Sequence, residues 1–224
     1  LAVLLCETNR SDRAFKLLEN WSTRNPRSAD ARVELARLYE EYGDSERAKG
    51  QLQTALQLDP SNARAWAAMG QLRDRAGDPA QALANYQIIL EKYPDYPRRD
   101  EVLYIMASNT YEAGKKDKAI AHYWELIKQY PNSDYVGDAY LAMGEHYFNS
   151  NDVLKAQKAL KKALETKKPK IYSYALYKLA WCDYNLQEWD AAITKFKKVV
   201  KYTNEQNAKA KDRDNIQLKS EALN

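Results

Sequence analysis

The chain has 224 residues, of which 45% are hydrophobic and 29% are charged, and its formal net charge is +4. This hydrophobic fraction is typical of a folded protein and argues against a chain that is disordered throughout. Every apolar run is only a handful of residues long, far too short to span a bilayer. The small positive charge does not by itself predict a nucleic-acid partner.

The chain opens with an apolar stretch, LAVLLC, at residues 1–6. It carries no positively charged segment before it, and bulky Leu5 precedes Cys6, so it does not read as a lipoprotein signal. We expect it to be part of a helix, and we expect the native N-terminus and any targeting signal to lie outside this sequence. Cys6 and Cys182 fit no metal or redox spacing and are expected to be buried thiols.

Prolines and turn residues then recur at regular intervals. Pro26, Pro60 and Pro94 are 34 residues apart, and Pro131 follows after 37. Residues 63–94 and 137–169 share one pattern: an aromatic residue, then Met-Gly, then a turn of Gly or Asn followed by Asp, then alanine. Apolar residues three and four positions apart predict two helices per repeat. The turn residues would end the first helix and cap the second, and proline would stop the second.

The alanine early in each second helix gives the clearest measure of the period. The alanines are Ala14, Ala48, Ala82, Ala119, Ala156 and Ala192. The spacing between them is 34, 34, 37, 37 and 36 residues, which predicts six helical hairpins, the first one incomplete at its N-terminus. Small residues in the first helices, such as Gly70 and Gly144, are expected to let the two helices of a hairpin approach closely.

This pattern resembles the tetratricopeptide repeat (TPR) family, over about nine-tenths of the chain. The resemblance implies an all-α fold: a right-handed α-solenoid of about six TPR hairpins plus a C-terminal helix. It also implies a protein that binds another protein or a peptide, that is not an enzyme and that needs no cofactor.

Composition divides the chain into three parts. Residues 1–87 contain 10 Arg and 2 Lys, and residues 88–224 contain 3 Arg and 20 Lys. We therefore expect an Arg-rich array at 1–87, a Lys- and Tyr-rich array at 88–200, and a polar capping helix or truncated repeat at 201–224. Arg and Lys are nearly equivalent on solvated helix faces. The change from Arg to Lys therefore reflects the origin of the sequence rather than its function. Two interpretations stay open: two TPR proteins joined near residue 88, or one gene whose halves diverged.

The two arrays also resemble different relatives. Residues 1–87 are similar to generic bacterial TPR arrays, as in LDPSNARAWAAMGQLRDRAGDPAQAL. Residues 88–224 contain QYPNSDYVGDAYLAMGEHYF, which is similar to TPR segments of bacterial periplasmic and outer-membrane-associated proteins. The second resemblance implies a cell-envelope location by analogy only, and a cytoplasmic location stays open.

The concave wall of a TPR superhelix is lined by the first helix of each hairpin, which defines the expected binding groove. In the first array the wall is charged, and its candidate contacts are Arg37, Arg64 and Arg75. In the second array it becomes aromatic, with Tyr104, Tyr111, Phe148, Tyr174, Tyr177, Trp181 and Tyr184. Aromatic rings are common anchors of interfaces, so we expect this part to hold the partner. Two alternatives stay open: the rings pack between hairpins, or residues 201–224 fill the groove.

Other functions find less support in the sequence. TPR proteins that grip acidic chaperone C-termini carry Lys and Asn on successive groove helices, whereas the stripe here reads Val33, Arg37, Gln71 and Tyr104. His122 and His146 lie in different hairpins without further ligands at metal spacing, so no metal site and no catalytic residue are expected. The lysine runs at residues 161–170 and 195–202 are expected to be solvated, which predicts no nucleic-acid partner and no membrane insertion.

The leading hypothesis is a non-enzymatic scaffold or adaptor that holds a peptide or a protein in its groove. One alternative is an engineered or fused repeat protein with a structural purpose. Another is a cell-envelope complex subunit that assembles through its ends. The incomplete first hairpin also invites end-to-end self-association of the chain.

Overall fold

The computed structural model describes residues 11–209 of the chain, and it describes side chains from residue 15 to residue 206. The apolar stretch at residues 1–6 with Cys6, the side chain of Ala14 and the final residues 210–224 therefore lie outside the described part.

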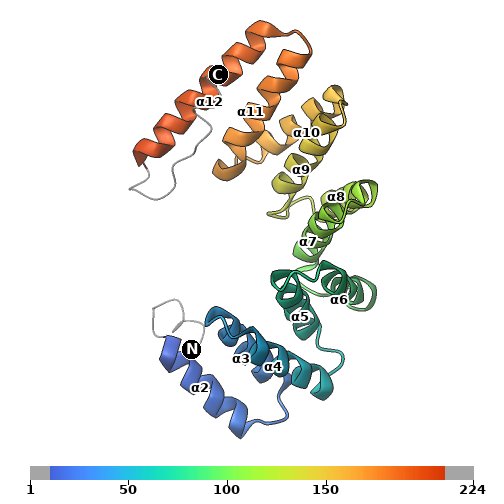
Figure 1. The fold of residues 1–224 in the computed structure, drawn as a ribbon, viewed down its shortest axis with the longest axis vertical. Helices are drawn as coiled ribbons and strands as arrows, with labels where there is room; N and C mark the ends of the chain where they lie inside the picture. The colour runs from blue at the N-terminus through green and yellow to red at the C-terminus, as the bar shows by residue number, and fades with distance from the viewer. Residues whose placement is uncertain (1–10, 210–224) are drawn as a thin grey trace. The chain divides into compact units, whose positions relative to one another are not determined.

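Every regular element within residues 11–209 is an α-helix, as the sequence predicted (Figure 1). The helices are α2 (Ser11–Arg24), α3 (Ala29–Glu41), α4 (Ser45–Leu58), α5 (Ala63–Arg75), α6 (Pro79–Lys92), α7 (Arg99–Glu112), α8 (Lys116–Gln129), α9 (Val136–Asn149), α10 (Val153–Glu165), α11 (Pro169–Asn185) and α12 (Trp189–Lys209). Four pairs of consecutive helices form hairpins: α3 with α4, α5 with α6, α9 with α10, and α11 with α12. Helix α2 corresponds to the second helix of the predicted first hairpin.

The predicted alanine period is confirmed in the hairpins from α3 to α12. The early alanines of the second helices are all at most 2% exposed: Ala48, Ala82, Ala119, Ala156 and Ala192. The two helices of a hairpin pack together, as α3 does with α4, α9 with α10, and α11 with α12. First helices of successive hairpins also touch, since α3 contacts α5 and α9 contacts α11.

The turns that end in Asp44, Asp78 and Asp152 have the predicted chemistry, whereas Lys115 before α8 makes no side-chain capping bond. Gly77 and Asn151 have φ values of +75° and +59°, in the left-handed region that glycine and asparagine tolerate. The next residues cap the second helices: the side chains of Asp78 and Asp152 accept hydrogen bonds from the backbone N–H groups of Gln81 and Lys155 at 3.1 and 3.2 Å.

In two hairpins, the close approach of the helices depends on a glycine in the first helix. A Cβ on Gly70 would lie 2.5 Å from Cε1 of Tyr86, and one on Gly144 would lie 2.7 Å from Cδ2 of Leu160. Tyr86 and Leu160 come from α6 and α10 and are almost completely buried. A side chain at either glycine would therefore push the second helix away from the first.

The chain divides into two compact units, one up to Asn109 and one from Thr110. The first unit has apolar clusters around Leu52 and Met69 and around Tyr86 and Met106. The second has a cluster around Leu160 and Leu179. The composition change near residue 88 falls inside the continuous helix α6, and residues 201–209 continue α12 without a break. The assignment of 1–87, 88–200 and 201–224 to separate parts stays a prediction.

We expect Gly70→Ala to lower the free energy of unfolding by about 1–3 kcal/mol, because its Cβ would overlap the ring of Tyr86. Urea titration followed by circular dichroism measures this change. Gly50→Ala is the matched control, because Gly50 lies in the middle of α4 and a Cβ added there would have no atom within 4 Å. The control should raise the free energy of unfolding by about 0.5–1 kcal/mol. Equal effects at the two glycines would contradict the close approach.

Candidate functional site

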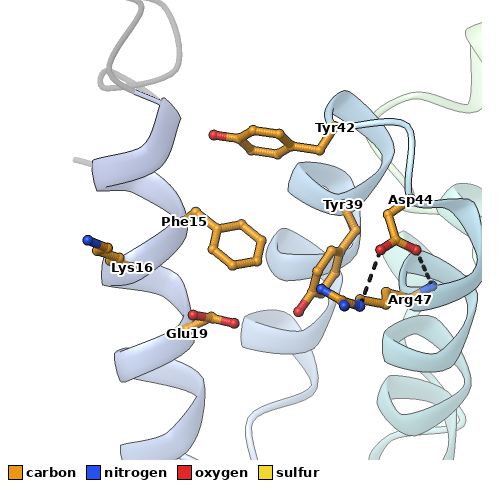
Figure 2. A pocket seen from close by; sticks show the side chains of 7 residues that line it. All are labelled: Phe15, Lys16, Glu19, Tyr39, Tyr42, Asp44 and Arg47. Atoms are coloured by element: carbon orange, nitrogen blue, oxygen red, sulfur yellow. Dashed lines mark hydrogen bonds and ion pairs between the residues drawn. The ribbon is translucent and has the colours of Figure 1, made fainter.

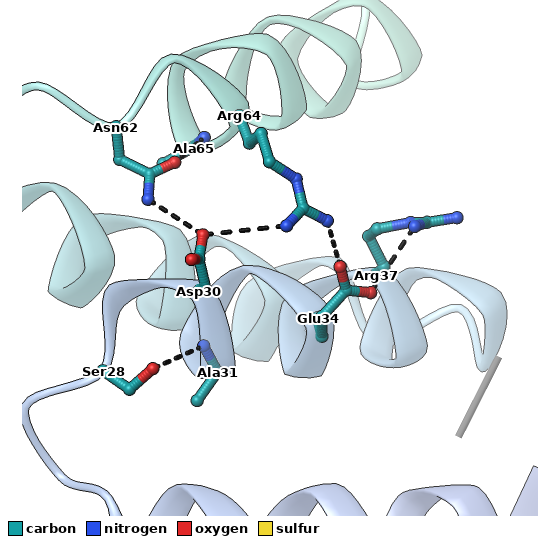
Figure 3. Close-up of polar contacts among 8 residues, drawn as sticks. All are labelled: Ser28, Asp30, Ala31, Glu34, Arg37, Asn62, Arg64 and Ala65. Atoms are coloured by element: carbon teal, nitrogen blue, oxygen red, sulfur yellow. Dashed lines mark hydrogen bonds and ion pairs between the residues drawn. The ribbon is translucent and has the colours of Figure 1, made fainter. Parts of the chain in front are cut away.

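Arginines predicted for the groove of the first unit pair with acidic residues of the neighbouring first helix (Figure 3). The guanidinium of Arg64 on α5 forms ion pairs with Glu34 and with Asp30 on α3, the latter at 3.7 Å. Arg75, also on α5, pairs with Glu40 of α3 at 3.3 Å. These pairs join two successive hairpins, and the carboxylates of α3 compensate the arginine charges of α5.

The third predicted arginine, Arg37, pairs along its own helix with Glu34 at 3.5 Å. Nearby, burial raises the pKa of Glu40, and the positive charges of Arg75 and Arg37 oppose that rise. Because the arginine side chains of these pairs are at least half exposed, each pair contributes only up to about 1 kcal/mol of stability. This face of the first unit is therefore charged but nearly balanced.

A polar network in the first unit connects side chains of α5, α6 and α7. Asp74 on α5 accepts hydrogen bonds from the hydroxyl of Tyr86 at 2.7 Å and from the side-chain amide of Asn109 on α7. Burial, together with the bond to Asp74, raises the pKa of Tyr86 far above its usual range. Tyr104, another predicted groove residue, is half-buried on α7.

In the second unit, the predicted ring of Tyr111 meets α9. It stands edge-on to His146 with the ring centroids 5.8 Å apart, and Nζ of Lys116 lies 5.7 Å from the tyrosine centroid. Burial and then the charge of Glu145 raise the pKa of Tyr111. Tyr111 thus remains half-buried against α9.

Two further predicted groove residues, Phe148 and Tyr174, contact Lys178 where α9 and α11 lie side by side. Nζ of Lys178 lies 5.5 Å from the ring centroid of Phe148 and 5.4 Å from that of Tyr174. The hydroxyl of Tyr174 donates a hydrogen bond to a carboxylate oxygen of Glu145 at 2.5 Å. An ammonium group therefore rests between two rings from two different hairpins.

The remaining predicted rings form an aromatic cluster with α12. Tyr177 and Trp181 of α11 stand edge-on to Phe196 of α12, with centroid separations of 6.0 and 5.4 Å. Tyr184 meets Trp189 at 4.9 Å and is 47% exposed. Tyr177 and Trp181 thus pack between the two helices of their own hairpin, while Tyr184 stays partly open to solvent. We call Phe148, Tyr174, Tyr177, Trp181 and Tyr184 the aromatic face.

A buried ion pair fixes the helix that carries most of the aromatic face. Asp183 on α11 is 1% exposed, and its carboxylate pairs with the ammonium of Lys195 on α12. The side-chain amide of Gln157 on α10 donates a further hydrogen bond to it at 3.2 Å. Burial of the adjacent Cys182 raises the pKa of its thiol to about 11, which makes that thiol unreactive at neutral pH.

The first unit also holds a pocket that the sequence did not reveal (Figure 2). Its volume is about 540 Å³, and its walls come from α2, α3 and the start of α4. The lining residues are Phe15, Lys16, Glu19, Tyr39, Tyr42, Asp44 and Arg47. The ring of Phe15 stands edge-on to Tyr39 and Tyr42, at 5.1 and 5.7 Å. Because the lining comes from separate hairpins, no spacing along the chain marks it in advance.

The described residues contain neither a candidate metal site nor a helix that could span a membrane. No cluster of three or more His, Cys, Asp or Glu side chains there could hold a metal ion. His122 lies 3.8 Å from Glu125 on its own helix, and Nδ1 of His146 is buried without a hydrogen bond. Among the described helices, none combines the length and apolar content that crossing a bilayer requires.

Four family models match the chain, and each is described as a tetratricopeptide repeat. They match residues 5–72, 67–134, 137–169 and 174–202. The matches therefore extend through both units and every described hairpin. No curated protein sequence matches the chain.

Solved structures share the fold at low sequence identity. PilW, described as a widely conserved type IV pilus biogenesis factor, has a TM-score of 0.75 and 16% identity over 100% of this chain and 95% of its own. PilF of Pseudomonas aeruginosa has a TM-score of 0.74 and 15% identity over 93% and 94% of the two chains. YrrB, described as having an unusual peptide-binding site, has a TM-score of 0.65 and 16% identity over 86% and 97%.

We expect Lys195→Met to lower the free energy of unfolding by about 3–5 kcal/mol, because it leaves the buried carboxylate of Asp183 without its cation. Adding Asp183→Asn should recover part of the loss. Lys198→Met on the exposed side of α12 is the control and should change stability by less than about 0.5 kcal/mol. Urea unfolding measures all three variants, and equal losses for Lys195→Met and Lys198→Met would contradict a structural role for the pair.

Proposed function

Because the chain belongs to the tetratricopeptide repeat family, we propose that it holds a peptide segment of another protein against the aromatic face of its second unit. Proteins of this family are non-enzymatic scaffolds for protein–protein interaction, and this chain is such a scaffold. The proposal concerns where the partner binds and through which side chains.

One observation supports the choice of the second unit. The arginines of the first unit direct their charges to Asp30, Glu34 and Glu40, whereas the aromatic face keeps apolar ring surface partly open to solvent. Its first helices, α9 and α11, lie side by side, so one bound segment could touch both. Tyr and Trp offer large contact areas with few rotatable bonds, which favours binding at low entropic cost.

The rings of the aromatic face differ in how free they are to bind. Tyr177 and Trp181 already pack against Phe196, so they mainly shape the floor beneath a ligand. Tyr184 is 47% exposed and offers the most open ring. We therefore assign direct contact chiefly to Tyr184, and we assign support to the two packed rings.

A bacterial cell-envelope setting remains a second part of the proposal. It is supported by the similarity of residues 88–224 to TPR segments of periplasmic and outer-membrane-associated proteins. The absence of a nucleic-acid partner and end-to-end self-association also remain expectations. Fractionation of source cells, and light scattering across a concentration series of the purified chain, test location and self-association respectively.

Selection of a phage-displayed random peptide library against the full chain tests the binding site. We expect enriched peptides whose affinity falls about tenfold or more in Tyr184→Ala, because a central interface ring contributes about 2 kcal/mol. Trp124→Ala is the matched control, since Trp124 is 49% exposed and lies on α8 outside the aromatic face. Fluorescence anisotropy with the best synthetic peptide measures each affinity.

Two results would count against the proposed site. Equal loss of affinity in Tyr184→Ala and Trp124→Ala would remove the aromatic face from the binding site. Failure of the library to yield any enriched peptide would favour the alternative of a repeat protein with a structural purpose.

A further inference from the structure

We infer that Lys178 binds an acidic side chain of the partner peptide, so that the aromatic face recognises an Asp or Glu next to an apolar residue. This inference rests on the proposed function and specifies the chemistry of the ligand. It is carried by the position of Lys178 and by the pairing of the charges around it.

Lys178 reaches the surface between two hairpins. It lies in the middle of α11 and is half-buried, with Nζ 5.5 Å from the Phe148 centroid and 5.4 Å from the Tyr174 centroid. The negative faces of the two rings attract the ammonium group and hold it in place. Ring contacts do not neutralise the charge, so the ammonium can still bind an anion.

Two carboxylates on α9 and α11 have other partners. Glu145 on α9 accepts a hydrogen bond from the Tyr174 hydroxyl at 2.5 Å. Asp183 on α11 is buried and pairs with Lys195. Within the part of the chain that the structure describes, Lys178 forms no ion pair with either of them or with another carboxylate.

Some lysines of the second unit pair with carboxylates of their own helix or of the turn before it. Along α10, Lys155 pairs with Asp152 at 2.6 Å and Lys162 with Glu165 at 2.8 Å. On α12, Lys201 pairs with Glu205 at 4.0 Å. Lys178 differs from these lysines because aromatic rings, rather than a carboxylate, surround its ammonium group.

The surroundings also favour a carboxylate ligand over water. Rings on both sides exclude part of the solvent, and a charge-assisted hydrogen bond is stronger where the local dielectric is low. Lys178 and Trp181 are three residues apart on α11, so they share one side of that helix. A peptide with its acidic side chain on Lys178 would bring the adjacent residue towards the rings of Trp181 and Tyr184.

The inference is tested by comparing the peptides that the full chain selects with those selected by its Lys178 variants. The probe is the best library peptide, together with a copy in which its Asp or Glu is replaced by Asn or Gln. We expect the acidic peptide to bind the unchanged protein about tenfold more tightly than the amide copy. The two peptides should bind Lys178→Met equally well, and Lys178→Arg should restore most of the preference.

Lys198→Glu is the matched control for net charge, since Lys198 is an exposed residue of α12. It should leave the tenfold preference intact, whereas Lys178→Glu should abolish it. Circular dichroism and thermal melting of each variant establish that the fold is retained. If Lys178→Glu alone fails to fold, the comparison of Lys178→Met with Lys178→Arg decides the matter.

Each remaining outcome counts against the inference. Enriched peptides without acidic residues, or an acid preference that persists in Lys178→Met, would overturn the role of Lys178 while leaving the proposed function standing. A library that yields no binding peptide at all would overturn both.

Discussion

The close packing of the two helices of a hairpin is the constraint on which the rest of the structure depends. At Gly70 and at Gly144 the second helix comes so near that a single Cβ would meet the side chain of Tyr86 or Leu160. A TPR hairpin is too small to bury its apolar stripe alone, so hairpins must also stack. Close packing inside each hairpin sets the spacing at which first helices of successive hairpins meet, as α3 meets α5 and α9 meets α11.

That meeting of first helices produces different surfaces in the two units. In the first unit, Arg64 reaches across to Asp30 and Glu34, so charge joins the hairpins. In the second unit, Tyr174 reaches across to Glu145, and Lys178 of the same helix rests on Phe148. Both units use the same backbone arrangement, and the side chains on the first helices decide whether ion pairs or aromatic rings join successive hairpins.

The repeat could be predicted from the sequence because its signals are local: alanine every 34–37 residues, turns of Gly or Asn followed by Asp, and prolines at the ends. Side-chain partners were not predictable in the same way. Arg64 and Glu34 are 30 residues apart, and the pocket near Phe15 is lined from three helices. Periodicity placed Tyr177 and Trp181 on the expected wall, but it carried no information that Phe196 of the next helix would meet both rings.

The change from arginine to lysine along the chain also has physical consequences. The planar guanidinium of Arg64 contacts two carboxylates at once, which suits a structural link between hairpins. The compact ammonium of Lys178 cannot form such a fork, and its place between two rings leaves its charge uncompensated by the described carboxylates. An uncompensated charge costs free energy when it is partly desolvated, and a binding partner's carboxylate would relieve that cost. The same helix surface that links hairpins in the first unit is therefore the one that we propose for recognition in the second.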